Sequence, residues 1–151
     1  MSDQHLSPAN VMVLLQRGDG RILAVRHNDK SKTSANQVTV IGGKLEEDEF
    51  IDEGELHEET GVRVAASDLE ICQTVHYRGP DGVRVIGAVS TAQRWQGEPC
   101  NAEMDKHDAI LWIDPCNPPT DCHPYIRKAL ANFMTGHLYG NITVPASGGG
   151  A

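Results

Sequence analysis

Long apolar runs are missing from this sequence. The longest uninterrupted apolar stretch, residues 11–15, is far too short to cross a bilayer. The chain also opens without a basic leader followed by an apolar run, so no signal peptide is predicted. We therefore expect a cytoplasmic protein that has no membrane partner.

Closely spaced cysteine pairs are missing as well. The four cysteines, at positions 72, 100, 116 and 122, follow no CxxC spacing. Cys116, Cys122 and His123 are near enough in sequence to suggest zinc. Tetrahedral zinc, however, takes four ligands that usually come in tight pairs. Free thiols in a reducing cytoplasm are the expectation.

Positive charge is in short supply. The sequence has 13 Lys and Arg residues against 21 Asp and Glu residues, a formal net charge of -8. Such a surface repels a nucleic acid polymer, which is therefore not expected as a partner. A small polyanionic substrate meets the same repulsion, so an enzyme acting on one needs a bound cation or a local Arg/Lys cluster. Neither a Ser-His-Asp arrangement nor a Walker-type phosphate loop is found.

What the sequence does contain is typical of one globular domain. Its 151 residues are 39% hydrophobic and 23% charged, and no repeat is visible. Apolar runs bounded by turn residues predict strands, and a 3.6-residue period followed by Gly136 predicts one amphipathic helix. The predicted strands are 11–15, 22–25, 38–41, 69–77, 83–90 and 111–113, and the helix is 124–135. This mixture predicts an α+β or mixed α/β class, with one domain over 1–145 and a flexible Gly-rich tail over 146–151.

An acidic segment after the third predicted strand carries most of the functional information. On a helix, the spacing of Glu55, Glu58 and Glu59 places three carboxylates on one face, where they repel one another unless a cation neutralises them. Mg²⁺ prefers such oxygen ligands and keeps waters that a phosphate can replace. The alternative is an acidic helix face in solvent. Two neighbouring features favour a site: Leu56 provides an apolar anchor, and Gly42-Gly43 lets the backbone approach a ligand or metal.

These residues resemble the Nudix box, the pattern G-x5-E-x7-R-E-U-x-E-E-x-G-U in which U is aliphatic. Gly43 and Glu49 match its first part, and residues 55–62 match its last part position by position. Gly61, just after the acidic stretch, also reads as a helix C-terminal cap. The resemblance extends over most of the chain, and the C-terminal half is similar to MutT-like members.

The middle of the box departs from the family pattern. Only residues 50–54 separate Glu49 from Glu55, so three positions are missing and the family's arginine is among them. Removing three residues from a continuous helix turns it by roughly 300° and shortens it by about 4.5 Å. Two explanations stay open: a naturally shortened helix start, or a sequence that lacks three residues of the real chain. The second is favoured, because inserting x-x-Arg after Gly54 restores the whole box.

The resemblance implies the Nudix fold, a mixed β-sheet between helices, and a small nucleotide substrate. The implied reaction is hydrolysis of a nucleoside diphosphate linked to another moiety, with a nucleoside triphosphate favoured. One to three Mg²⁺ ions, for which Mn²⁺ can substitute, would be held by Glu55, Glu58, Glu59 and the carbonyl of Gly43. Glu59 or Glu103 would accept the proton of the attacking water.

Arg26 and Lys44 are candidates for contacting the substrate phosphates. For each of them, and for Glu103, an ordinary surface residue is the alternative. Trp112 is interpreted as a core residue rather than a platform for stacking a base. A homodimer stays open. The rival function is a degenerate Nudix module that binds a nucleotide or a protein without hydrolysis, for which the irregular box is the only support.

Overall fold

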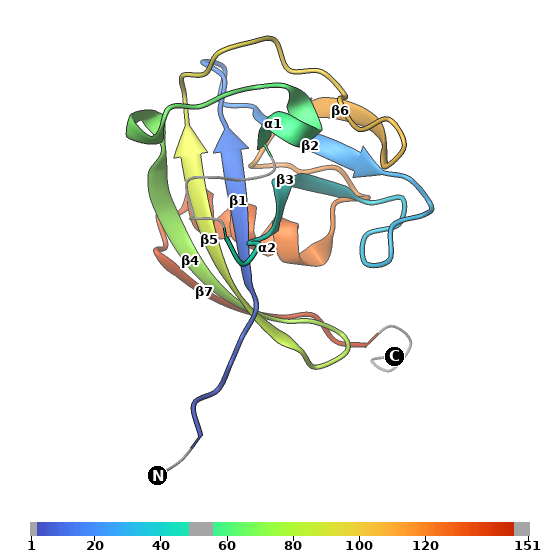
Figure 1. Ribbon diagram of the computed structural model, residues 1–151, viewed down its shortest axis with the longest axis vertical. Coiled ribbons are helices and arrows are strands. Elements are labelled where there is room, and N and C mark those ends of the chain that lie inside the picture. Colours follow the sequence, from blue (N-terminus) through green and yellow to red (C-terminus); the bar gives the residue numbers. More distant parts are fainter. Residues whose placement is uncertain (1–2, 49–55, 147–151) are drawn as a thin grey trace.

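The computed structural model describes residues 3–48 and 56–146, and within them the strands form one twisted sheet (Figure 1). The sheet has seven strands in the order β6-β2-β3-β1-β5-β4-β7. Their bounds are β1 Ala9–Leu15, β2 Ile22–His27, β3 Val38–Lys44, β4 Glu70–Arg78, β5 Arg84–Ala92, β6 His107–Ile113 and β7 Tyr139–Thr143.

Parallel and antiparallel pairs are mixed in this sheet. β2 pairs antiparallel with both β3 and β6, β3 pairs antiparallel with β1, and β4 pairs antiparallel with β5. Two parallel pairs, β1 with β5 and β4 with β7, complete it. The β1–β5 pair joins distant parts of the chain, since Ala9 lies opposite Ile86. The predicted mixed class is confirmed.

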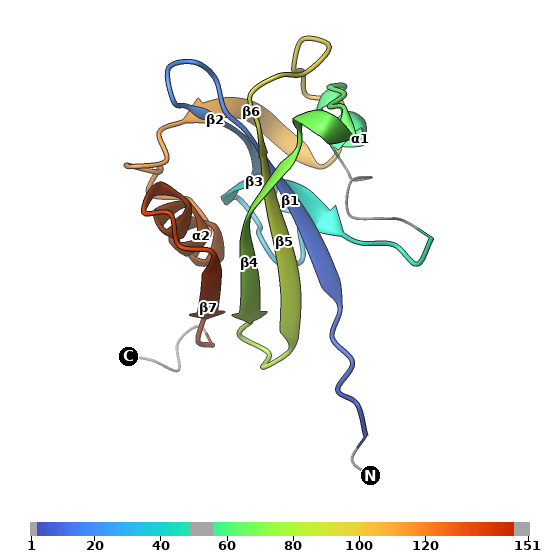
Figure 2. The same cartoon turned by 90° about the vertical axis from the view of Figure 1, so that its left-hand side faces the viewer.

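The two α-helices lie on opposite faces of the sheet, as Figure 2 shows. α2, Pro124–Met134, covers a core cluster that includes Met12, Ile22, Val40 and Leu130. α1, Leu56–Thr60, covers the other face, where Leu56 packs in a second cluster with residues of β1, β2 and β3. The alternation of side chains along each strand therefore assigns every strand residue to either the α1 face or the α2 face.

Local sequence accounts for both ends of α2. Nδ1 of His123 accepts a hydrogen bond from the backbone N–H of Tyr125 at 3.1 Å, and Pro124 occupies the first turn, where its missing N–H costs nothing. The helix ends before Gly136, whose φ of +74° suits glycine. Among the helices of residues 3–48 and 56–146, none is long and apolar enough to span a membrane.

The predicted strands and the predicted helix are all present, and the two largest differences concern β6 and β7. β6 begins at His107, four residues before the predicted start at Leu111. β7 was not predicted, because its sequence Tyr-Gly-Asn-Ile-Thr contains a glycine, an asparagine and few apolar residues. Ile142 is nevertheless only 3% exposed and belongs to the α2-face core. Apart from Ala146, the predicted flexible tail lies outside the described residues.

Candidate active site

α1 presents the glutamates of the acidic motif from a short, firmly anchored helix. Leu56 is buried, Glu59 is 8% exposed, and Glu58, the residue before it, is exposed to solvent. The hydroxyl of Thr60 donates to the carbonyl of Leu56 at 2.6 Å. The N–H of Gly61 donates to the carbonyl of His57 at 2.8 Å, and Gly61 has a φ of +74°. The predicted C-terminal cap at Gly61 is confirmed.

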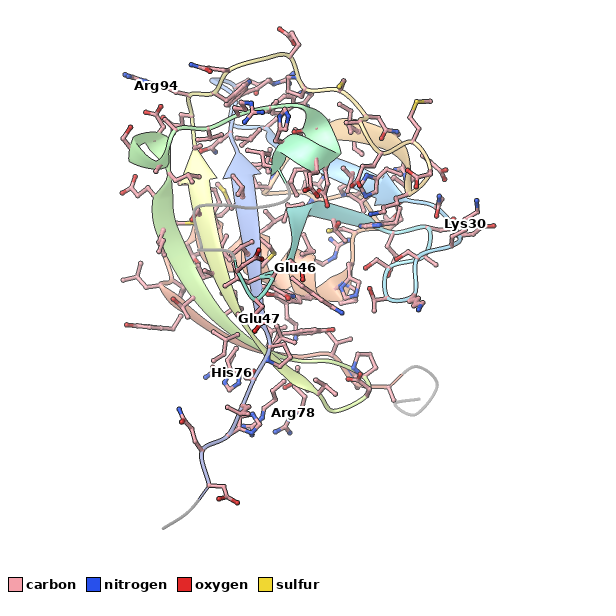
Figure 3. The ribbon with its side chains drawn as sticks, in the orientation of Figure 1. Lys30, Glu46, Glu47, His76, Arg78 and Arg94 are labelled. Carbon is pink, nitrogen blue, oxygen red and sulfur yellow. The ribbon has the colours of Figure 1, made fainter. Side chains whose placement is uncertain are left out.

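Two glutamates of the motif fall outside the described residues. These are Glu49 and Glu55, and the junction between Gly54 and Glu55 is outside the described residues as well. The shortened-helix and missing-residue explanations therefore both stay open. Of the described acidic segment, Glu46 and Glu47 lie on the connection that follows β3 (Figure 3).

The glycine pair lies at the end of β3 beside β1. Gly42 is opposite Met12 and Gly43 is opposite Val11 in the antiparallel register. A Cβ placed on Gly42 would come 2.9 Å from Cγ of Met12 and still closer to the carbonyl oxygen of Val11. The first glycine is therefore required by the neighbouring strand, a packing reason that the sequence did not reveal. Lys44, the last residue of β3, is exposed.

Glu103 lies in a segment that contacts α1 directly. The N–H of Ala102 donates to the carbonyl of Glu59 at 3.1 Å, and the N–H of Cys100 donates to that of Thr60 at 3.0 Å. The Glu103 side chain is 19% exposed and its Oε2 lies 3.2 Å from Nζ of Lys106. The structure thus brings Glu103, 44 positions from Glu59 in the sequence, beside the catalytic helix proposed from the motif.

Arg26 lies on the α2 face of β2, on the same side as Ile22 and Ala24. Its Nε donates to Oδ2 of Asp121 at 2.9 Å, and both side chains are more than one third exposed. The structure does not bring Arg26 together with the α1 glutamates. Its proposed contact with phosphate stays a prediction, which requires the Asp121 pair to open or to share the guanidinium.

His27, the next residue, is half-buried on the α1 face and belongs to a polar group with Thr39 and His107 that the sequence did not predict. Its Nε2 lies 2.8 Å from Oγ1 of Thr39, and its ring meets that of His107 edge-on, with centroids 4.9 Å apart. Burial, and then the neighbouring His107, lowers the pKa of His27 to about 4, so its ring is uncharged at neutral pH. The sequence could have indicated this position through the alternation of side chains along β2, since Leu23, Val25 and His27 share one face.

Trp112 also lies on the α1 face. It packs against the second core cluster, stacks on Trp95 with centroids 6.0 Å apart, and carries the guanidinium of Arg17 over its ring at 4.5 Å. These contacts agree with the interpretation of Trp112 as a core residue.

The donor chemistry of the site fits a hard divalent cation. The carboxylates of Glu58 and Glu59 and the main-chain carbonyl of Gly43 offer oxygen only, which Mg²⁺ prefers. Within residues 3–48 and 56–146, no three His, Cys, Asp or Glu side chains are near enough to form a metal site by themselves. Glu55, the third helix glutamate of the motif, is outside that part.

Three basic side chains are well separated over the surface. Figure 3 shows Arg94, Lys30 and Arg78 at three different edges of the molecule. Because they lie so far apart, these three residues do not form one basic surface that could hold a phosphate chain. The net charge of -8 adds repulsion of such a polyanion.

The fold is shared by solved Nudix structures. The chain is similar to the MutT NUDIX hydrolase from Burkholderia pseudomallei, with 24% identity, a TM-score of 0.74, and coverage of 84% of this chain and 98% of that chain. It is also similar to the MutT protein from Methanosarcina mazei Go1, with 22% identity, a TM-score of 0.72, and coverage of 89% and 97%. A bifunctional NMN adenylyltransferase/ADP ribose pyrophosphatase from Francisella tularensis has 21% identity and a TM-score of 0.65, over 89% of this chain and 42% of that one.

A search of curated protein sequences gives no significant match. The family model of the NUDIX domain, in contrast, matches residues 6–133, which include both halves of the irregular box, β1 to β6 and nearly all of α2. With the same arrangement of sheet and helices in the solved structures, this match establishes that the chain belongs to the NUDIX family and is a Nudix hydrolase.

Proposed function

We propose that the protein is a Mg²⁺-dependent pyrophosphohydrolase that cleaves a (d)NTP to the monophosphate and pyrophosphate. The observation that carries the proposal is the hydrogen bond from Ala102 to the carbonyl of Glu59, which joins the segment of Glu103 to α1. Glu59 and Glu103, two acidic residues from distant parts of the sequence, are thereby neighbours at the end of one short helix. Such a pair suits proton transfer from water beside a cation-bound phosphate.

Glu58 and Glu59, with Glu55 and the carbonyl of Gly43, would hold the metal. When bound, Mg²⁺ lowers the pKa of a coordinated water and offsets the charge of the phosphates. Glu59 or Glu103 accepts the proton that the attacking water loses. The water oxygen bonds to phosphorus, the bridging P–O bond breaks, and the departing phosphate leaves with the bonding electron pair.

The remaining residues of the proposal serve binding. Lys44 is exposed at the end of β3, one residue after Gly43, and its ammonium group supplies charge for a phosphate. Arg26 would bind a phosphate by exchanging its carboxylate partner Asp121. The similarity of the C-terminal half to MutT-like members favours a nucleoside triphosphate. The protein from Francisella tularensis is a bifunctional NMN adenylyltransferase/ADP ribose pyrophosphatase, so a chain that contains a related fold acts on a different nucleotide.

The proposal includes a cytoplasmic location, a small nucleotide as the partner, and no nucleic acid polymer. The net charge of -8 supports the last point, because a polymer would meet repulsion over the whole surface. A homodimer remains compatible with it.

The test measures phosphate release from a panel of nucleotides, with pyrophosphatase added to detect pyrophosphate. Activity is expected with Mg²⁺ or Mn²⁺, and a chelator should abolish it. Glu58→Gln and Glu59→Gln keep the side-chain size but remove a charge, so each should slow turnover by roughly 10²- to 10⁴-fold. Glu70→Gln, an exposed glutamate on β4, is the matched control and should retain full activity.

Two results would contradict the proposal. Full activity in either α1 variant would show that the metal face has been misplaced. Nucleotide binding by calorimetry without any release of phosphate would favour the degenerate module that binds without hydrolysis.

A further inference from the structure

Residues 100–107, here called the Glu103 loop, are fixed at both ends. At the first end, Cys100 and Ala102 donate backbone hydrogen bonds to the last two residues of α1. At the other end, the backbone N–H of Asn28 donates to the carbonyl of Lys106 at 3.0 Å, and its Nδ2 donates to that of Asp105 at 2.7 Å. The loop therefore bridges the catalytic helix and the end of β2.

One side chain of the loop joins its two ends. Nδ2 of Asn101 donates to the carbonyl of His107 at 2.8 Å, so that the intervening five residues form a closed ring. Inside this ring, the carbonyl of Glu103 accepts hydrogen bonds from the N–H groups of Lys106 and His107, each at 3.0 Å. His107 therefore bonds both to the backbone carbonyl of Glu103 and to the side chain of Asn101.

The asparagine is not explained by stability alone. Its Oδ1 is buried and has no hydrogen-bond partner among the described residues. A buried acceptor without a partner costs free energy, which an apolar side chain of the same size would avoid. Residues that lower stability in this way are found where a functional geometry has to be kept.

We propose that Asn101 is a positioning residue for Glu103. Its amide closes the Glu103 loop and keeps Glu103 beside the end of α1, where Glu59 lies. The Lys106 ammonium, 3.2 Å from the Glu103 carboxylate, orients that side chain within the closed loop. This inference rests on the proposed function, in which Glu103 serves the chemical step.

The test replaces Asn101 by leucine, which keeps the volume but removes the donor and the unpartnered acceptor. A misplaced catalytic group costs rate rather than binding, so kcat should fall about 10- to 100-fold while KM stays within about twofold. The control is Asn132→Leu on α2, which removes a comparable amide that donates to Gln73 at 3.2 Å on the other face of the sheet. That variant should keep its kcat.

A double variant separates positioning from general damage. In the Glu103→Gln background, Asn101→Leu should lower kcat no further, because the group that it positions is already disabled. If the two losses multiply, or if Asn132→Leu lowers kcat as much as Asn101→Leu does, the proposal is overturned.

Hydrogen exchange provides a measurement that does not depend on activity. In Asn101→Leu, the amides of Lys106 and His107 should exchange faster than in the unsubstituted protein, whereas those of α2 should not change. Unchanged protection in the Glu103 loop overturns the proposal whatever the kinetics show. If no nucleotide is cleaved by the unsubstituted protein, the proposed function fails, and hydrogen exchange still decides whether Asn101 holds the loop.

Discussion

Gly42→Ala tests how closely β1 and β3 approach beside the site. The added Cβ would lie against the carbonyl oxygen of Val11, 2.9 Å from Cγ of Met12 and 3.1 Å from its Cα. The Met12 side chain can rotate away, but the backbone of β1 cannot, because β1 is held between β3 and β5. The substitution therefore has to displace a central strand or distort the glycine pair.

The expected loss of stability follows from two opposing effects. Overpacking a well-packed interior costs about 1–3 kcal/mol, and a backbone contact favours the upper end of that range. Replacing glycine by alanine gives back about 0.4–1 kcal/mol by restricting the unfolded chain. The net destabilisation should be about 2 kcal/mol, which in a chain of this size lowers Tm by roughly 4–8 °C.

Urea unfolding followed by tryptophan fluorescence measures the change, since Trp95 and Trp112 are partly buried in the α1-face core. The control is Gly18→Ala, where an added Cβ meets nothing within 4 Å. The urea midpoint should fall for Gly42→Ala at an unchanged m value. For Gly18→Ala, the free energy of unfolding should stay within about 0.5 kcal/mol of the parent's. Equal midpoints for the two variants would refute the close contact between the strands.

Three further predictions concern single side chains. Glu103→Gln should reduce kcat by about 10²-fold or more with a smaller change in KM, as steady-state kinetics with excess Mg²⁺ would show; unaltered kinetics would leave Glu59 as the base. Because burial lowers the pKa of His27 from its ordinary value to about 4, its neutral form is favoured in the folded state. That contribution to stability is present above pH 6.5 and is lost as the pH falls towards 4. The urea midpoint should therefore drop over this pH range, and it should drop less in His27→Gln. An equal dependence of the midpoint on pH in both proteins would contradict this. Tyr125→Phe removes a buried hydroxyl that has no partner in the described part of the chain, so calorimetry should show an unchanged or raised Tm, whereas a loss above about 1 kcal/mol would reveal a missed partner.

The irregular box shows how far a local pattern can lead. Glu58, Glu59 and Gly61 lie within four residues of one another, so their spacing alone predicted a helix, its capped end and its acidic character. Glu103 could be suggested only by resemblance. Its position beside Glu59 results from backbone hydrogen bonds between segments that are far apart in the sequence, and no local pattern encodes them.

Arg26 and His27 mark the same limit within a single strand. The sequence predicted a strand ending there, because Ile22 to Val25 is an apolar run after a turn. Which of the two side chains faces α1 depends on the faces that the two helices cover. That choice is made when distant elements pack, and it placed His27 rather than Arg26 on the side of the glutamates.

The sequence by itself determined the class, most of the strands, α2 and the Nudix motif, because turn residues, side-chain periodicity and motif spacing act within a few residues of the chain. Only the tertiary structure decided the strand order, the presence of β7 and the reason for Gly42. Each of these depends on partners from elsewhere in the chain: β5 lies beside β1, β4 pairs with the weakly patterned β7, and the backbone of β1 leaves no space for a Cβ on β3. Long-range pairing of this kind is set by which apolar faces can be buried together, and a local pattern does not specify it.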